Sequence, residues 1–140
     1  MSRLKFGIQF SITSRLWRRH IDQRLAQVGF TDVSWSPLLH LDEFGDGISQ
    51  KALASSVGIE GSSLVRLLDS LEKKGLITRQ ADQHDRRTKR IYLTDEGRQQ
   101  VSVLRGHLQE IEEDMLSDIS DEEINTMLGV LNKLTTRFKS

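Results

Sequence analysis

The chain has 140 residues, 20 basic and 20 acidic side chains with a formal net charge of zero, and no cysteine. This length suits one domain or one compact unit, and the lack of cysteine excludes disulfides, thiolate metal sites and thiol redox switches. No apolar run approaches the roughly 20 residues of a membrane span, and the N-terminal stretch MSRLKFGIQF lacks the features of a signal peptide. We therefore expect a cytoplasmic protein that does not bind a membrane.

The charges are distributed unevenly. Residues 1–30 carry six basic and one acidic side chain, and residues 62–90 carry eight basic and four acidic ones, whereas 31–61 and 91–140 are acidic. Because salt screens charges beyond about 10 Å, DNA responds to a local basic patch rather than to the net charge. A neutral chain of this kind is therefore compatible with DNA binding.

The first part of the chain is predicted to form two helices. Apolar residues recur at helical spacing over 6–28, and Gly29 is typical of the residue that follows a helix end. A neighbouring stripe of aromatic residues predicts a second buried face, so this helix would pack against its own domain and against a partner chain. The next helix runs from Ser34 or Ser36 to Phe44, with Pro37 in its first turn.

A pair of short helices follows. Ser49 is a suitable N-cap for a helix over 50–57 that ends at Gly58, and a further helix starts near Gly61 and runs to Lys74. The leucines of this longer helix share one face and are expected in the core: Leu64, Leu67, Leu68 and Leu71. Two short helices joined by a tight glycine-containing turn are typical of a helix-turn-helix.

The segment after this helix is predicted to form a hairpin. Residues 76–80 and 90–93 suit two strands, and the connecting residues 81–89 are almost entirely polar and charged. A polar, basic connection without an apolar anchor is typical of a wing that projects into solvent.

Two helices complete the chain. Thr94 is expected to cap a helix that ends near Leu116, and Ser120 with Glu123 predicts a capping box for the last helix. The last helix continues to Phe138 with an apolar stripe that is too extensive for an isolated surface helix, so we expect it to pack in a dimer.

Three segments together carry a family resemblance: LWRRHIDQRL, VGIEGSSLVRLLDSLEKKGLITRQ and DRRTKRIYLTDEG. Over nearly its whole length the chain resembles the MarR family of transcriptional regulators, and within it the SlyA type. The resemblance implies a mainly α (α+β) fold of six helices plus a small β-wing. A winged helix-turn-helix would span 32–93, between dimerisation helices at 6–29 and 95–138.

The resemblance also implies a function. Such a protein would be a homodimer in the bacterial cytoplasm, associated with the nucleoid when bound to a pseudo-palindromic operator in double-stranded DNA. A small phenolic or aromatic acid would release it. SlyA-like proteins often have Gln-Pro where this chain has Gly61 and Ser62, which leaves the operator preference open.

The predicted DNA contacts lie on the recognition helix, 61–74, and on the wing, 81–89. An arginine on the helix can pair with guanine, serines can bond base edges or phosphates, and arginines at a wing tip suit a narrow minor groove. The predicted DNA-contact residues are Ser49, Gly61, Ser62, Ser63, Arg66, Ser70, Arg86, Arg87, Thr88 and Lys89. Asp85 is expected to be a structural partner of Arg87 or Arg90. Alternatively, the serines only cap the helix and the wing charges are solvated.

A ligand pocket is the second candidate site. An aromatic carboxylate requires a flat apolar surface and a cationic group. Both are offered by Arg15, Trp17 and Arg18 on the first helix together with Trp35 and His40 on the second. The alternative is that both tryptophans belong to the core.

Other functional classes have little support in the sequence. His107 and Glu110 lie one helical turn apart, and His20 could approach them, but no second cluster of ligands accompanies them, so neither a metal nor a cofactor is predicted. The chain lacks a nucleophile elbow, a phosphate-binding glycine loop and paired catalytic carboxylates, so it is not predicted to be an enzyme. The remaining alternative is a winged helix that binds protein, which would expose apolar residues on its fourth helix.

Overall fold

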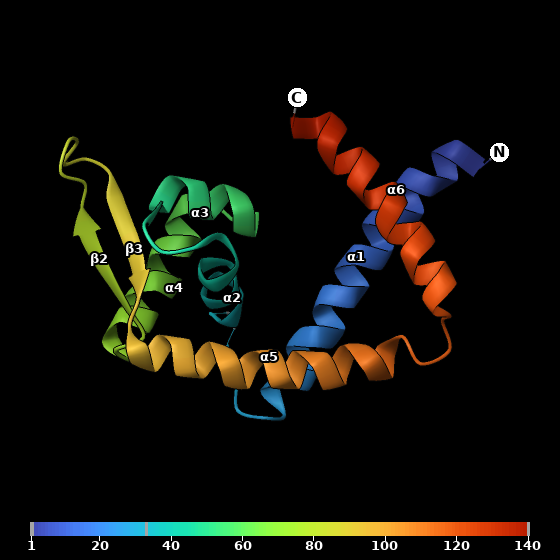
Figure 1. Ribbon diagram of the computed structural model, residues 1–140, viewed down its shortest axis with the longest axis horizontal. Coiled ribbons are helices and arrows are strands. Elements are labelled where there is room, and N and C mark those ends of the chain that lie inside the picture. The colour runs from blue at the N-terminus through green and yellow to red at the C-terminus, as the bar shows by residue number, and fades with distance from the viewer. Residues whose placement is uncertain (1, 33, 140) are drawn as a thin grey trace. The chain divides into compact units, whose positions relative to one another are not determined.

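The computed structural model describes residues 2–32 and 34–139. Within them the chain forms α1 (Ser2–Ala26), α2 (Trp35–Phe44), β1 (Ile48–Ser49), α3 (Gln50–Val57), α4 (Gly61–Lys73), β2 (Ile77–Ala81), β3 (Lys89–Leu93), α5 (Asp95–Met115) and α6 (Asp121–Lys139) (Figure 1). These six helices and the small sheet confirm the predicted fold class. The chain divides into two compact units, one ending at Leu108 and the other starting at Gln109.

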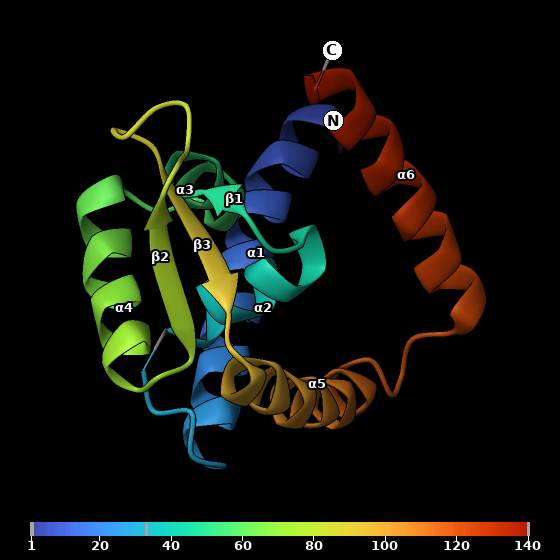
Figure 2. The same cartoon turned by 60° about the vertical axis from the view of Figure 1, so that its left-hand side comes forward.

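The sheet is antiparallel, with the strand order β1-β3-β2. Ile77 pairs with Leu93 at one end of the hairpin and Ala81 with Lys89 at the other, so the wing connection projects beyond the last strand pair (Figure 2). The short strand β1 was not predicted from the sequence. It ends at Ser49, whose side chain also accepts a hydrogen bond from the backbone N–H of Ala52 at 3.1 Å, as expected for the N-cap of α3.

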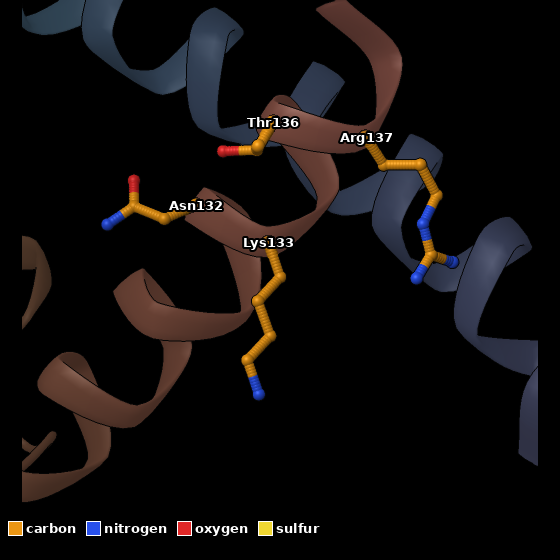
Figure 3. A pocket seen from close by; sticks show the side chains of 4 residues that line it. All are labelled: Asn132, Lys133, Thr136 and Arg137. Carbon is orange, nitrogen blue, oxygen red and sulfur yellow. The ribbon is translucent and has the colours of Figure 1, made fainter. Parts of the chain in front are cut away.

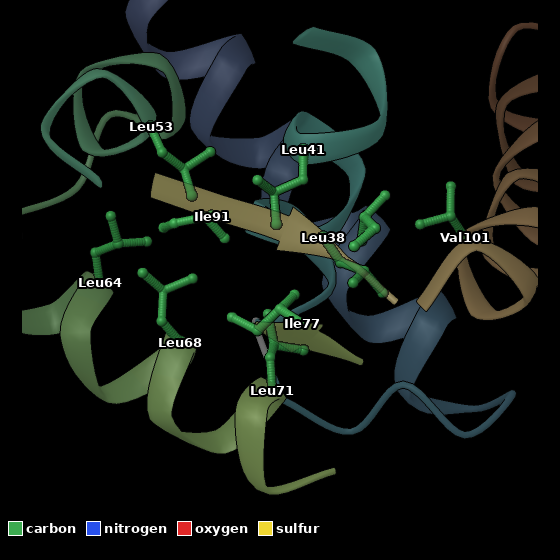
Figure 4. Packing of buried hydrophobic residues seen from close by; sticks show 10 residues of the cluster. Leu38, Leu41, Leu53, Leu64, Leu68, Leu71, Ile77, Ile91 and Val101 are labelled. Atoms are coloured by element: carbon green, nitrogen blue, oxygen red, sulfur yellow. The ribbon is translucent and has the colours of Figure 1, made fainter. Parts of the chain in front are cut away.

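The core of the winged lobe is formed by side chains from α2, α3, α4, the sheet and α5 (Figure 4). Its members are Leu38, Leu41, Leu53, Leu64, Leu68, Leu71, Ile77, Ile91, Leu93 and Val101. Three of the four leucines predicted to face inward from α4 are fully buried, and Leu67 is half-buried. Burial of one leucine stripe fixes the rotation of α4 about its own axis, so the opposite face of the helix must point to solvent.

The start of α5 is fastened to the turn between α4 and β2. The Thr94 hydroxyl accepts a hydrogen bond from the Gly97 N–H at 3.0 Å and donates one to the Gly75 carbonyl at 2.6 Å, which confirms Thr94 as the cap. Gly97 lies so close to this turn that a Cβ on it would stand 2.1 Å from the Leu76 carbonyl oxygen. Only glycine permits this approach.

The second unit contains α6, whose predicted capping box is confirmed. The Glu123 carboxylate accepts a hydrogen bond from the Ser120 N–H at 3.1 Å, and the Ser120 hydroxyl accepts one from the Glu123 N–H at the same distance. The helix leaves several large apolar side chains exposed, Phe138 most of all. Among the described residues, no helix is long and apolar enough to cross a membrane.

Candidate nucleic-acid interface

The solvent-facing side of α4 carries three of the residues predicted to contact DNA. Ser62, Ser63 and Arg66 are exposed, and Ser70 further along the helix is half-buried. The N-cap of α4 is Glu60, so the two serines lie inside the first turn of the helix rather than at its cap position. Within the described residues, Arg66 has no hydrogen-bond or ion-pair partner, so its guanidinium is available to a ligand.

The wing tip is held together by aspartate side chains. Asp82 accepts hydrogen bonds from the backbone N–H groups of His84 and Asp85, both at 3.1 Å, and Asp85 accepts one from the Arg87 N–H at 3.0 Å. The backbone adds a hydrogen bond from the Thr88 N–H to the Asp85 carbonyl at 2.9 Å. These bonds fix the loop locally, in the manner of Asx turns.

Arg90 anchors the base of this loop. Its Nε donates to Asp82 at 2.8 Å, and its guanidinium also donates to the Gly47 carbonyl at 2.8 Å. The hydrogen bond from Arg90 lowers the pKa of Asp82, and the same bond raises the pKa of Arg90. From the sequence, Asp85 was predicted to be the structural partner of Arg87 or Arg90. In the structure Asp85 lies beside Arg87, and Arg90 pairs with Asp82 instead.

The remaining cations of the wing point into solvent. Arg86 and Lys89 are exposed and have no hydrogen-bond or ion-pair partner among the described residues. The Arg87 side chain is 96% exposed, and its Nε lies 3.7 Å from Asp85. An ion pair this long and this exposed contributes little, so the Arg87 guanidinium is effectively free. The Thr88 hydroxyl is engaged with Asp85 at 3.3 Å.

One arginine between the recognition helix and the wing is fully neutralised, and the sequence did not reveal its role. Arg79 on β2 donates to Asp69 at 2.6 Å and to Glu72 at 2.7 Å, both on α4. The hydrogen bond from Arg79 lowers the pKa of Glu72, and the two carboxylates raise the pKa of Arg79, Glu72 having the larger effect. Arg79 therefore joins helix to strand rather than offering its charge to a ligand.

The predicted ligand pocket is only partly assembled. The Arg18 guanidinium lies 4.8 Å from the centre of the Trp35 ring, and both residues contact Asp22, which accepts a hydrogen bond from the indole N–H of Trp35 at 2.8 Å. Trp35 is buried, whereas Trp17 is half-buried. Of the other two members, Arg15 is exposed, and His40 places its Nδ1 2.7 Å from the Ser36 carbonyl.

Two further observations concern ligands. A hollow on α6 is lined by Asn132, Lys133, Thr136 and Arg137, which offers polar side chains but no aromatic surface (Figure 3). Among the described residues no group of three His, Cys, Asp or Glu side chains could hold a metal ion, and the His107 ring lies edge-on to Phe30 instead.

Comparison with known proteins identifies the family. Residues 28–88 match the family model described as MarR family. The transcriptional regulator PA3341, whose crystal structure is known, is 36% identical in sequence to this chain. The match covers 96% of this chain and 98% of PA3341, with a TM-score of 0.82. The chain belongs to the MarR family. It is thus a transcriptional regulator and not an enzyme, as the sequence predicted.

Two other solved structures are similar to this chain at lower sequence identity. CouR from Rhodococcus jostii RHA1, crystallised with p-coumaroyl-CoA, is 26% identical, with 92% of this chain and 90% of that chain covered and a TM-score of 0.76. The transcriptional regulator SlyA is 21% identical, with coverages of 95% and 93% and a TM-score of 0.76. The likeness to SlyA shows a shared fold.

Proposed function

We propose that this MarR-family regulator binds a pseudo-palindromic DNA operator as a homodimer, with α4 in the major groove and the wing, 81–89, in the adjacent minor groove. The observation that carries the proposal is the division of arginines in the winged lobe. Arg79 and Arg90 are paired within the fold, whereas Arg66, on the exposed face of α4, and Arg86, at the wing tip, are unpaired among the described residues. Unpaired guanidinium groups on a helix and a hairpin tip suit guanine and a narrow A·T-rich groove respectively.

The remaining predicted contacts complete the interface. Lys89 and the free N–H groups at the start of α4 suit phosphates, and Gly61 allows the DNA backbone to approach the helix closely. The proposed set of contacts also includes Ser49, Ser62, Ser63, Ser70, Arg87 and Thr88.

A second copy of the chain is the proposed partner of the terminal helices. α1 leaves Leu4, Phe6, Ile8, Phe10, Ile12 and Leu16 exposed, and α6 leaves Met127, Leu128, Val130 and Phe138 exposed. Apolar surface of this extent is costly in water, and a second copy could cover it. A dimer would also supply the two recognition helices that an operator with half-sites about 34 Å apart requires.

A charge within the α1 surface is therefore expected to disrupt both dimer and operator binding. Phe10 stacks on Phe6 with ring centroids 5.8 Å apart, and Phe10→Asp would place a carboxylate at the interface. We expect the variant to be monomeric by light scattering and to bind an operator selected from random duplexes on the order of a hundredfold more weakly, because one half-site no longer assists the other.

Phe44→Asp is the matched control, because Phe44 is exposed but lies on α2, outside the proposed dimer surface. It should remain dimeric. A wild-type chain that selects no DNA from the random pool would refute the proposed function, and a Phe10→Asp variant that stays dimeric would refute the assignment of α1.

We further propose that an aromatic acid binds around Arg15, Trp17, Arg18, Trp35 and His40 and releases the DNA. The Arg18 Nε makes no hydrogen bond and lies 3.6 Å from the Asp22 carboxylate, and the guanidinium lies next to the Trp35 ring. A ligand carboxylate that replaced Asp22 could accept from the guanidinium while its aromatic ring packs nearby. CouR was crystallised with the thioester of such an acid. Binding of the acid would shift the population toward dimers in which the distance between the two recognition helices does not match successive major grooves.

Phenolic acids such as p-coumarate are therefore expected to stabilise the wild-type chain. At ten times the dissociation constant the gain is roughly 1.4 kcal/mol, or a Tm increase of about 5 °C, measurable by thermal shift. Arg18→Gln should abolish the shift, and Arg19→Gln, at the exposed neighbouring position, should retain it. No shift and no loss of operator binding at millimolar acid would contradict the pocket.

A further inference from the structure

One apolar side chain stands out on the recognition helix. Between Ser34 and Thr94, the large hydrophobic side chains that are exposed are Phe44 and Val65. Phe44 contacts the ring of His40, with centroids 5.9 Å apart, whereas Val65 lies among polar and charged residues on the solvent side of α4. Its neighbours in sequence are the buried Leu64 and the exposed Arg66.

Neither the core nor the helix explains a valine at this position. The core contacts of α4 come from Leu64, Leu68 and Leu71, and Val65 is 36% exposed. Valine is also a weaker helix former than alanine, leucine or arginine, because its branched side chain loses rotamer freedom against the preceding turn. A branched apolar side chain that lies outside the core cluster and is 36% exposed to water is suited to a contact outside the chain.

The surroundings of Val65 indicate what kind of contact this is. Val65 lines a hollow together with Gln50, Glu72, Arg79 and Lys89, between α4, the start of α3 and the wing side of the sheet. Arg79 and Glu72 neutralise one another there, and Lys89 has no partner among the described residues. An apolar group next to a free lysine and the free Arg66 fits a polyanion that also offers an apolar patch.

The floor of the DNA major groove has one such patch. The C5-methyl group of thymine is the apolar group that base edges present there, and small apolar side chains recognise it by contact. We propose that Val65 recognises a thymine methyl group next to the base pair that Arg66 contacts, and so determines part of the operator sequence. This inference rests on the proposed placement of α4 in the major groove.

Replacing thymine by deoxyuridine tests the proposal, because deoxyuridine keeps every hydrogen-bonding group and lacks only the methyl. An operator is first selected from random duplexes with the wild-type chain, and each thymine of a half-site is then replaced in turn, with its symmetry mate. For the wild-type chain we expect one position at which the replacement in both half-sites weakens binding about tenfold, since each lost methyl contact accounts for roughly a three- to fourfold effect.

Val65→Ala supplies the second half of the test. It should bind the thymine operator about tenfold more weakly than the wild-type chain and should no longer distinguish thymine from deoxyuridine at that position. Phe44→Ala removes an exposed apolar side chain from α2, outside the proposed dimer surface and the recognition helix, and should behave like the wild-type chain. Circular dichroism melting verifies that both variants are folded.

Three results would overturn the proposal while leaving the proposed function intact. The wild-type chain could bind its operator without sensitivity to any thymine methyl. Val65→Ala could lose affinity equally for both duplexes, which would indicate contact with deoxyribose. Or Val65→Ala could bind both duplexes as tightly as the wild-type chain binds thymine DNA, which would show that the side chain does not contribute to DNA binding. A wild-type chain that selects no DNA would instead refute the proposed function itself.

Discussion

Gly97→Ala is expected to destabilise the protein by on the order of 3 kcal/mol, because the new methyl group overlaps backbone that cannot move freely. The added Cβ would stand 2.1 Å from the Leu76 carbonyl oxygen and 3.2 Å from the Leu93 Cδ2. Relief requires α5 to move away from the turn, which breaks the hydrogen bond from the Thr94 N–H to the Leu76 carbonyl, 3.0 Å long. Urea denaturation followed by circular dichroism, at equal protein concentration, measures the loss.

Gly106→Ala is the matched control on the same helix. A Cβ at Gly106 meets nothing within 4 Å, so alanine should stabilise the helix by up to about 1 kcal/mol through its better helix propensity. If Gly97→Ala unfolded at the same urea concentration as Gly106→Ala, the close approach of α5 to the α4–β2 turn would be disproved.

Arg86→Ala is expected to weaken operator binding on the order of a hundredfold while leaving the fold and the dimer unchanged. Each charge-assisted contact contributes roughly 1.5 kcal/mol or more, and a dimer loses two. Arg87→Ala should also weaken operator binding. The exposed ion pair with Asp85 is weak, so the Arg87 guanidinium is free to contact DNA. Fluorescence anisotropy at physiological salt measures both affinities.

Arg19→Ala removes the same charge from an exposed position on α1 and should retain nearly full affinity. This control separates the loss of a specific wing contact from a general change in charge. If Arg86→Ala and Arg87→Ala both bound as tightly as the parent, the assignment of the wing would be wrong.

The elements were predictable wherever their signals were local. The leucine spacing of α4, the hydroxyl of Thr94 and the Ser120–Glu123 pair are each contained within about one or two helical turns, and the structure follows them. The strand β1 was missed because two residues carry no periodicity, and Ile48 becomes a strand residue only by pairing with Ile91. Such a long-range pairing leaves no trace in a sequence window.

The exposed face of the candidate site could be predicted from the sequence. The ion pairs that decide which of its arginines are free could not. The core face of α4 determined which side is exposed, so Arg66 could be assigned to the outside. Which arginines are free depends on tertiary contacts: Arg79 meets two carboxylates on α4, and Arg90 meets Asp82 across the hairpin. In the sequence these residues look the same as Arg86.

The hydrogen bonds within the wing tip order this loop before it meets DNA. Asp82 and Asp85 already accept the backbone N–H groups of His84, Asp85 and Arg87 in the isolated chain. Ordering of this loop therefore occurs during folding and not during association. The proposed encounter with DNA then requires no coupled folding of the tip, and its rate would be limited by diffusion and orientation.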